Sequence, residues 1–390
     1  MAAEFARCFG KTPSLWGRAP GRVDLMGSHT DYNQGYVLTL SIDCDTWIAA
    51  HPRDDRQVTV YSLNVEGGGA FSLDSIEPNQ TTPWTNYVRG VAAALQAAGL
   101  ALSGFDGLIH STIPFGSGLS SSAALEVATA IIFKMLGGWE LEPRQLALLC
   151  RRAENQFVGV NCGILDQYTS ALGEEGCALL LDCRHLTSRP APLADGIRVV
   201  IGDTRAAQIL TGPEYASRQA QCEVGAARLA RFYPEVMALR DVSLAQFTRY
   251  EGDLPPVVAR RCRFIIEENR RVLDLAEALS TADLGRIKSL TADSYAGARD
   301  LYEIGSPEMA AMIEAMRSAP GVIGARQTGA GFGGCMVAFV AGDLVDKFAQ
   351  HVQEAYAKRT GLQPKVYLVQ AAPGAGPLQF SLTHNLAVES

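Results

Sequence analysis

The stretch PFGSGLSSSAA at residues 114–124 decides the fold, because it joins a strand-like segment, residues 108–113, to a helical segment, residues 121–136. Gly116 and Gly118 let the backbone adopt positive φ, and the serines supply hydroxyl donors. The helix that follows presents unpaired N–H groups and the positive end of its dipole. A loop of this composition between a strand and a helix predicts a phosphate-binding site.

This loop differs from two common nucleotide-binding loops. No Gly-Lys-Ser or Gly-Lys-Thr follows its glycines, and Ser121 stands where G-x-G-x-x-G has its third glycine. A flexible turn followed by a serine N-cap is the alternative for a loop of this kind. Eleven consecutive residues of this composition favour phosphate binding over that alternative.

Two further clusters lie on either side of the loop in the sequence. The segment TGAGFGGC, residues 328–335, lets the backbone pack closely against a ligand or against another chain segment, and both interpretations stay open. The segment GRVDLMGSHTDYN, residues 21–33, concentrates polar groups before a strand-like run. Such groups suit a polyhydroxylated ligand or a capped surface turn.

Asp166 is preceded by two apolar residues, Ile164 and Leu165. A carboxylate in such surroundings is costly to bury unless a cation or a hydrogen-bond donor meets it, and Arg22 is a candidate partner. A lone aspartate is more often a helix or turn cap. The prediction of a functional Asp166 therefore depends on the four segments together.

The chain alternates strand-like and helical segments, which predicts an α+β protein of two lobes. We expect the lobes to span residues 1–190 and 191–390. The first contains strands at 37–50, 57–63, 108–113 and 178–182 and helices at 84–98, 121–136 and 142–157, followed by a proline-containing connection at 184–196. The second contains strands at 197–202, 325–340 (a pair) and 364–370 and helices at 214–232, 257–279 and 282–299.

Composition excludes several classes of protein. Of 390 residues, 47% are hydrophobic, which excludes a disordered chain, and 34 Lys and Arg against 41 Asp and Glu give a net charge of −7. That balance argues against a nucleic-acid-binding surface. No secretory signal and no apolar run long enough for a membrane span are visible. The nine dispersed cysteines are typical of reduced thiols, so we expect a cytoplasmic protein.

In collinear order, these segments resemble the three motifs of the GHMP kinase superfamily, and more narrowly the galactokinase family. The resemblance runs through residues 17–22, 27–33, 84–90, 114–124, 162–167, 214–223 and 326–335. It implies a two-lobed α+β fold with the active site in the cleft between an N-terminal and a C-terminal domain. It also implies phosphorylation of the C1 hydroxyl of a free sugar, dependent on ATP and Mg²⁺, with sugar and ATP as partners.

The resemblance also assigns roles. Asp166 would take or orient the proton of the C1 hydroxyl, and Arg22 would stabilise developing negative charge. The implied sugar-binding residues are Ser28, His29, Asp31, Gly163 and Tyr215. The implied ATP-binding residues are Trp84 and Tyr87 near the adenine and Gly116, Ser117, Gly118, Leu119, Ser120, Ser121, Ser122 and Ala123 around the phosphates. Ser122 and Glu154 would hold Mg²⁺, and the glycine loop at 329–334 would close over the reaction centre.

The chain departs from the residues usual in the family at Ser28, Asp24, Ala216, Phe264 and Tyr295, and the first two lie in the same segment. Where galactokinases have Gly-Glu-His-Thr-Asp-Tyr-Asn, this chain has Ser28 in place of the glutamate that accepts a hydrogen bond from the sugar's 6-hydroxyl, and Asp24 replaces the usual asparagine. The substrate is then galactose, or an analogue altered at C6 such as L-arabinose or galacturonate. A non-catalytic galactokinase-like sugar sensor is the alternative to an enzyme, and intact Arg22 and Asp166 favour the enzyme.

Overall fold

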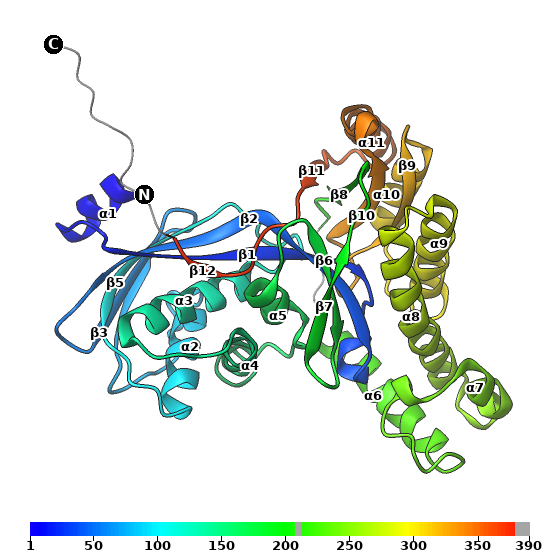
Figure 1. Ribbon diagram of the computed structural model, residues 1–390, viewed down its shortest axis with the longest axis horizontal. Coiled ribbons are helices and arrows are strands. Elements are labelled where there is room, and N and C mark those ends of the chain that lie inside the picture. The colour runs from blue at the N-terminus through cyan, green and yellow to red at the C-terminus, as the bar shows by residue number, and fades with distance from the viewer. Residues whose placement is uncertain (207–211, 379–390) are drawn as a thin grey trace.

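Two β-sheets, each covered by helices, organise the chain. The computed structural model describes residues 1–206 and 212–378. Figure 1 shows the larger sheet with helices α2 to α5 below it, and the smaller sheet at the other end of the molecule beside the long helices α8 and α9. The expected two-lobed α+β architecture is confirmed.

The first sheet has eight strands in the order β12-β1-β2-β5-β3-β4, with β6 paired to β2 and β7 paired to β6. All pairings are antiparallel except that of β3 with β5. The strands are β1 Leu15–Met26, β2 Tyr36–Pro52, β3 Gln57–Ser62, β4 Gly68–Ser72, β5 Phe105–Ser111, β6 Cys177–Asp182, β7 Thr187–Pro192 and β12 Gly376–Pro377. The helices of this lobe are α1 Ala2–Phe9, α2 Thr85–Ala97, α3 Ser121–Gly137, α4 Pro143–Ala153 and α5 Leu165–Leu172.

The second sheet has four antiparallel strands in the order β11-β8-β10-β9. Its strands are β8 Ile197–Asp203, β9 Val322–Gln327, β10 Cys335–Ala341 and β11 Lys365–Val369. The helices are α6 Gly212–Leu229, α7 Leu244–Tyr250, α8 Pro256–Ser280, α9 Leu284–Asp300, α10 Pro307–Ser318 and α11 Val345–Thr360. Short helical turns lie at Asp31–Asn33, Glu154–Val158, Leu239–Asp241, Glu251–Asp253 and Gly342–Leu344.

Helix α3 packs closely against β1 at Gly17, a residue that has no side chain. A Cβ placed on Gly17 would lie 3.1 Å from Ile132 and 3.3 Å from the carbonyl oxygen of Ala128. The helix can approach the strand closely only because this position is glycine. Its alanines and branched residues, including Ala124 and Val127, are fully buried in the main core. This packing fixes the N-terminus of α3, and with it the loop at residues 114–124.

Several sequence predictions need correction. The polar cluster at residues 21–33 is not a surface turn, because its first part belongs to the central strand β1 and Asp24 and Thr30 are fully buried. The connection at 184–196 contains strand β7. The helix expected at 142–157 ends at Ala153 and continues as a π-helical turn, Glu154–Val158, which carries Glu154.

The expected helices beyond residue 200 and the paired strands around residues 325–340 are confirmed. The chain passes from the first sheet to the second between Pro192 and Ile197, and β12 then returns to pair with β1. The division into residues 1–190 and 191–390 stays a prediction, since one cut would separate β12 from its sheet. Within the described residues, every helix is too short or too polar to cross a bilayer.

Candidate active site

Arg22 and Asp166 meet at the centre of the site. Arg22 lies on β1, and Asp166 lies in the first turn of α5. The Arg22 Nε and Nη2 atoms lie 2.7 Å and 2.5 Å from Asp166 Oδ1, and Ser120 Oγ donates to Asp166 Oδ2 over 2.7 Å. Both carboxylate oxygens therefore have a donor, and the Asp166 side chain is oriented from two directions.

The loop at residues 114–124 takes up backbone conformations that favour glycine. Gly116 and Gly118 have φ of 68° and 79°, and Ser120 has φ of 61° at the start of α3. The loop rests on β1, where the Arg22 N–H donates to the Leu119 carbonyl and the Arg22 Nη1 donates to the Gly118 carbonyl. The predicted strand-loop-helix is thus present, with Arg22 bound to both the loop and Asp166.

The serines of this loop have different environments. Ser117 donates to the Pro114 carbonyl over 2.7 Å and closes the turn, and Leu119 is buried in the core. Ser121 and Ser122 are half-buried in the first turn of α3, where N–H groups without intrahelical partners attract anions. The Ser120 hydroxyl donates a hydrogen bond to Asp166. Contact of these loop residues with ATP stays a prediction.

A buried acidic cluster, formed by Glu126, Glu154, Cys162 and Gln167, lies beside Asp166. The Gln167 amide nitrogen donates to Glu154 Oε2 over 2.5 Å and to Glu126 Oε2 over 2.9 Å. The Cys162 thiol donates to Glu154 Oε2 over 3.1 Å. Among the described residues, neither glutamate forms an ion pair with an arginine or lysine, so this cluster has an uncompensated negative charge whenever its carboxyls ionise.

The acidic cluster fits a cation. Burial raises the pKa of Glu154, and burial together with the charge of Glu154 raises the pKa of Glu126 well above its ordinary value. Glu126 Oε1 and Gln167 Oε1 are buried without a hydrogen-bond partner. No group of three His, Cys, Asp or Glu able to hold a metal occurs in residues 1–206 and 212–378. Mg²⁺ commonly takes only one or two carboxylates and fills its shell with phosphates and water, so Glu154 with Ser122 is compatible with it.

His29 is held as a neutral imidazole by a chain of hydrogen bonds. Its Nε2 lies 2.8 Å from the Ala330 carbonyl, which can only accept, so this nitrogen carries the proton. Its Nδ1 then accepts from the Tyr32 hydroxyl over 2.8 Å, and Tyr32 in turn accepts from Tyr302. Burial lowers the pKa of His29 to about 4, which agrees with the neutral form.

Asp31 and Gly163 are in direct contact. A Cβ placed on Gly163 would lie 1.5 Å from Asp31 Oδ2, so any side chain there would displace the carboxylate. Burial, with the charge of Asp166 added, raises the pKa of Asp31 to about 6. The Tyr215 ring completes this side of the site, 5.4 Å from the His29 ring and 5.3 Å from the Tyr32 ring. The structure thus gathers Asp31, Gly163, His29 and Tyr215 near Asp166.

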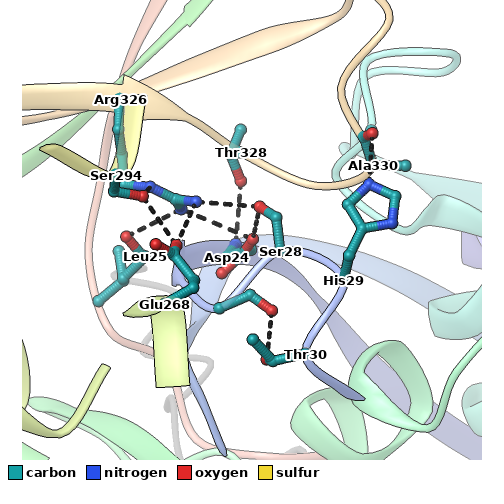
Figure 2. Close-up of polar contacts among 12 residues, drawn as sticks. Asp24, Leu25, Ser28, His29, Thr30, Glu268, Ser294, Arg326, Thr328 and Ala330 are labelled. Atoms are coloured by element: carbon teal, nitrogen blue, oxygen red, sulfur yellow. Dashed lines mark hydrogen bonds and ion pairs between the residues drawn. The ribbon is translucent and has the colours of Figure 1, made fainter. Parts of the chain in front are cut away.

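Ser28 belongs to a buried network of charges that joins the two lobes. Its hydroxyl donates to Asp24 Oδ2 over 2.6 Å and accepts from Arg326 Nη2 over 3.0 Å (Figure 2). Arg326, on β9, also donates to the Leu25 carbonyl, Glu268 and Ser294. We call Asp24, Ser28, Glu268, Ser294 and Arg326 the ion network. Two of the positions where the sequence departs from its family, Asp24 and Ser28, are therefore bonded to each other.

The remaining predicted residues are distributed around these groups. Tyr87, in α2, lies near the acidic cluster. Burial, followed by the charge of Glu154, raises the pKa of Tyr87 to about 12. The Trp84 indole N–H is buried without a partner. The roles of both residues at the adenine stay predictions. The second glycine loop reaches the first, since a Cβ on Gly329 would lie 3.9 Å from the Gly118 carbonyl oxygen.

The sequence interpretation missed Glu126, Gln167, Glu268 and Arg326. Glu126 lies two residues beyond the loop at residues 114–124, and Gln167 follows Asp166, so their position beside predicted site residues was the available signal. Glu268 lies within the long helix α8, where no local pattern marks it.

Comparisons with known proteins agree with this geometry. Three family models match the chain. The model described as "GHMP kinases N terminal domain" matches residues 86–174, the model described as "Galactokinase galactose-binding signature" matches residues 3–52, and the model described as "GHMP kinases C terminal" matches residues 274–358. A galactokinase of Chloroflexus aggregans is 45% identical over 366 residues, 93% of this chain and 94% of the relative. A galactokinase of Roseiflexus sp. is 42% identical over 376 residues, 96% of each chain.

The chain belongs to the galactokinase family of GHMP kinases. Among solved structures, the Lactococcus lactis galactokinase complexed with galactose matches with a TM-score of 0.92 and 34% identity, covering 97% of this chain and 98% of the other. A mevalonate kinase matches with a TM-score of 0.63 and 16% identity over 92% of this chain and 99% of its own, which shows the fold alone. The resemblance to galactokinases and the expectation of a sugar kinase are confirmed.

Proposed function

We propose that this galactokinase-family enzyme transfers the γ-phosphoryl group of ATP to the C1 hydroxyl of galactose. The observation that carries the proposal is the Arg22 and Asp166 pair, which lies between the phosphate loop and the residues Asp31, Gly163 and His29. The loop supplies a place for phosphates on one side of Asp166. The other side supplies carboxylate, imidazole and phenol groups that suit a polyhydroxylated ligand.

The mechanism follows from the orientation of Asp166. The oxygen of the C1 hydroxyl attacks the γ-phosphorus, the bond from that phosphorus to ADP breaks, and the hydroxyl proton leaves toward a carboxylate oxygen of Asp166. Arg22 and Ser120 hold those oxygens in place, while their remaining lone pairs can accept the proton. Arg22 also places positive charge beside the loop, because phosphoryl transfer depends mostly on positioning and charge stabilisation.

Mg²⁺ would be held by Glu154 and Ser122 together with the phosphates of ATP. When bound, it supplies positive charge that neutralises the phosphate oxygens. The support from the structure is the buried Glu154 carboxylate, which has no ion-pair partner within residues 1–206 and 212–378 and whose charged form is favoured by the nearby Ser122 hydroxyl. The N-terminus of α3 and the amides of the loop add positive potential without a basic patch, which agrees with a net charge of −7.

Galactose is the substrate we favour over galacturonate and L-arabinose. Asp24 and Glu268 are both fully buried beside Ser28, and Arg326 already lies against both carboxylates. The carboxylate of galacturonate near Ser28 would add a negative charge beside these two buried acids, which is costly in a buried site. L-arabinose lacks the carbon that carries the 6-hydroxyl and would leave buried polar groups unpaired. The named galactokinase relatives add support for galactose.

A coupled ADP-release assay with the three sugars tests this proposal. We expect kcat/KM for galactose to exceed that for L-arabinose and galacturonate by about a hundredfold. Asp166→Asn is expected to lower kcat by about 10²–10⁴-fold and to keep ATP binding, whereas Asp346→Asn, at an exposed aspartate of α11, serves as the matched control. Binding of ATP and galactose without ADP release would indicate a sensor and contradict the proposal.

A further inference from the structure

Asp24 holds one carboxylate oxygen that nothing in the described structure satisfies. The residue is fully buried on β1, and its Oδ2 accepts from Ser28 and lies 3.6 Å from Arg326 Nη1. Its Oδ1 is buried without a hydrogen-bond partner. A buried carboxylate oxygen without a donor is unfavourable, so a group that brings a donor to it would bind with a gain in free energy.

The surrounding contacts prevent Asp24 from turning to satisfy this oxygen within the protein. Ser28 lies between Asp24 and Arg326, and the Asp24 N–H donates to the Thr328 hydroxyl over 3.0 Å. Arg326 is itself held by Leu25 of β1, Glu268 of α8 and Ser294 of α9 (Figure 2). Because the network is anchored in both lobes, Oδ1 keeps its position when the site is free of ligand.

Asp24 lies beside the residues that the proposed function uses. It follows Arg22 by two positions on β1, and Ser28, its hydrogen-bond donor, precedes His29. Its charge contributes to the raised pKa of Asp31, after burial and Asp166, and Arg22 in turn contributes to the electrostatic environment of Asp24. Thr328, which binds the Asp24 backbone, begins the second glycine loop. The Asp24 residue is therefore bonded to the glycine loop through its backbone and is near enough to Arg22 and Asp31 for their charges to interact.

We propose that Asp24 is a further substrate-binding residue, and that its Oδ1 accepts a hydrogen bond from one hydroxyl group of the sugar. The inference rests on the proposed function, since it requires that a sugar occupies this site. The preferred ligand is a neutral sugar, because Arg326 already lies against both Asp24 and Glu268 and burial raises the pKa of Asp24, so this site disfavours further negative charge. The network orients the carboxylate, and Asp24 makes the contact that selects a hydroxyl-bearing substrate.

The test compares galactose with its 2-deoxy, 3-deoxy, 4-deoxy and 6-deoxy analogues. For the wild-type enzyme, we expect kcat/KM to fall by about tenfold or more for the analogue that lacks the hydroxyl bound by Asp24. In Asp24→Ala, the preference for galactose over that one analogue should fall to about threefold or less, because the acceptor is gone. The preferences over the other three analogues should stay as in the wild type.

Two further variants complete the experiment. Ser289→Ala, at an exposed serine of α9 that lies outside the ion network, is the matched control, with all four preferences expected to remain unchanged. Asp24→Asn keeps an oxygen for Ser28 and Arg326 and places an amide nitrogen at the position of Oδ1, so it covers the case in which Asp24→Ala does not fold. In Asp24→Asn, the preference in kcat/KM for galactose over that one analogue should fall by about threefold or more.

The outcomes separate the inference from the proposed function. Turnover of galactose by the wild type, with all four preferences unchanged in a folded Asp24 variant, would overturn the inference and leave the function standing. A wild-type enzyme that uses no galactose would overturn both. Loss of all four preferences in the Asp24 variants, with all four kept in Ser289→Ala, would show a general change in the shape of the site and would also overturn the inference.

Discussion

Two buried groups of charges flank the reaction centre, and they are built in opposite ways. In the ion network, Glu268 lies 2.8 Å from Arg271 and 3.2 Å from Arg326, and these arginines lower its pKa in spite of burial. In the acidic cluster, Glu126 is equally buried but meets only the amide of Gln167, and its pKa is raised well above its ordinary value. Both glutamates are fully buried, so the difference lies in their partners.

The comparison teaches which charges are structural and which are available for ligands. Paired buried charges hold the lobes together whether or not a ligand is present. Unpaired acids keep a free energy cost that a bound cation relieves. The acidic cluster, beside the loop at residues 114–124, is therefore the side that we propose for metal and nucleotide. The ion network, beside Ser28 and His29, lies on the side that we propose for the sugar.

Arg326→Met should have the largest effect, because it removes the cation of the ion network. Asp24 and Glu268 would remain buried with one partner fewer, and we expect the free energy of unfolding to fall by about 3–5 kcal/mol. Chemical denaturation measures this change. Arg299→Met removes an exposed ion pair with Asp300 and should change the free energy by less than about 1 kcal/mol. If Arg326→Met and Arg299→Met lowered the free energy of unfolding equally, the buried ion network would not be a special source of stability.

Glu154→Gln should weaken metal binding without weakening the fold. The folded-state pKa of Glu154 is raised, so its ionisation opposes folding above the ordinary pKa, and removing the charge should leave stability at pH 7 equal or higher. Binding of Mn²⁺ in the presence of ATP, measured by electron paramagnetic resonance, should weaken by about tenfold or more. A variant that unfolds more easily, with metal binding intact, would assign Glu154 to structure instead.

Asp31 should make sugar binding dependent on pH. Its pKa is about 6, so below pH 6 the carboxyl is protonated in the folded enzyme and has lost acceptor capacity for a sugar hydroxyl. We expect kcat/KM for the sugar to fall by about tenfold per pH unit below that value, and to be level above it. Asp31→Asn should be less active and should lack this particular inflection. An unchanged pH profile in the variant would assign the titration to another group.

Glu126→Gln should have the smallest effect on stability. Because burial and the charge of Glu154 raise its pKa well above the ordinary value, the neutral form of the carboxyl is favoured, and an amide of the same shape replaces it at little cost. The free energy of unfolding should change by less than about 1 kcal/mol, whereas Glu268→Gln, which removes an ionised and paired carboxylate, should cost about 1–3 kcal/mol. A larger loss of stability in Glu126→Gln than in Glu268→Gln would contradict the contrast between the acidic cluster and the ion network.

Local sequence patterns predicted the parts of the site that lie close together in the chain. The loop at residues 114–124 was predicted because glycines, serines and the following apolar helix are contiguous, and Arg22 was named as a partner of Asp166 because a buried carboxylate needs one. The surface-turn alternative for residues 21–33 failed because polar residues on a central strand look like a loop when their buried partners are distant in the sequence.

The ion network shows why the rest could not be predicted. Asp24, Glu268 and Arg326 come from β1, α8 and β9, and no spacing in the chain links them. Ser28 was expected to be free for the sugar, yet its donor is used by Asp24 and it accepts from Arg326. Only the packing of α8 and β9 against β1 determines that these two family departures act together.

The sequence by itself determined the family of this protein, the strand-loop-helix at residues 114–124 and the pairing of Arg22 with Asp166, because these depend on contiguous motifs and on the chemistry of single residue types. The tertiary structure decided which buried charges are compensated. Compensation depends on distances between elements far apart in the chain, and in a low-dielectric interior those distances set whether a carboxylate is neutralised by an arginine or left available for a ligand.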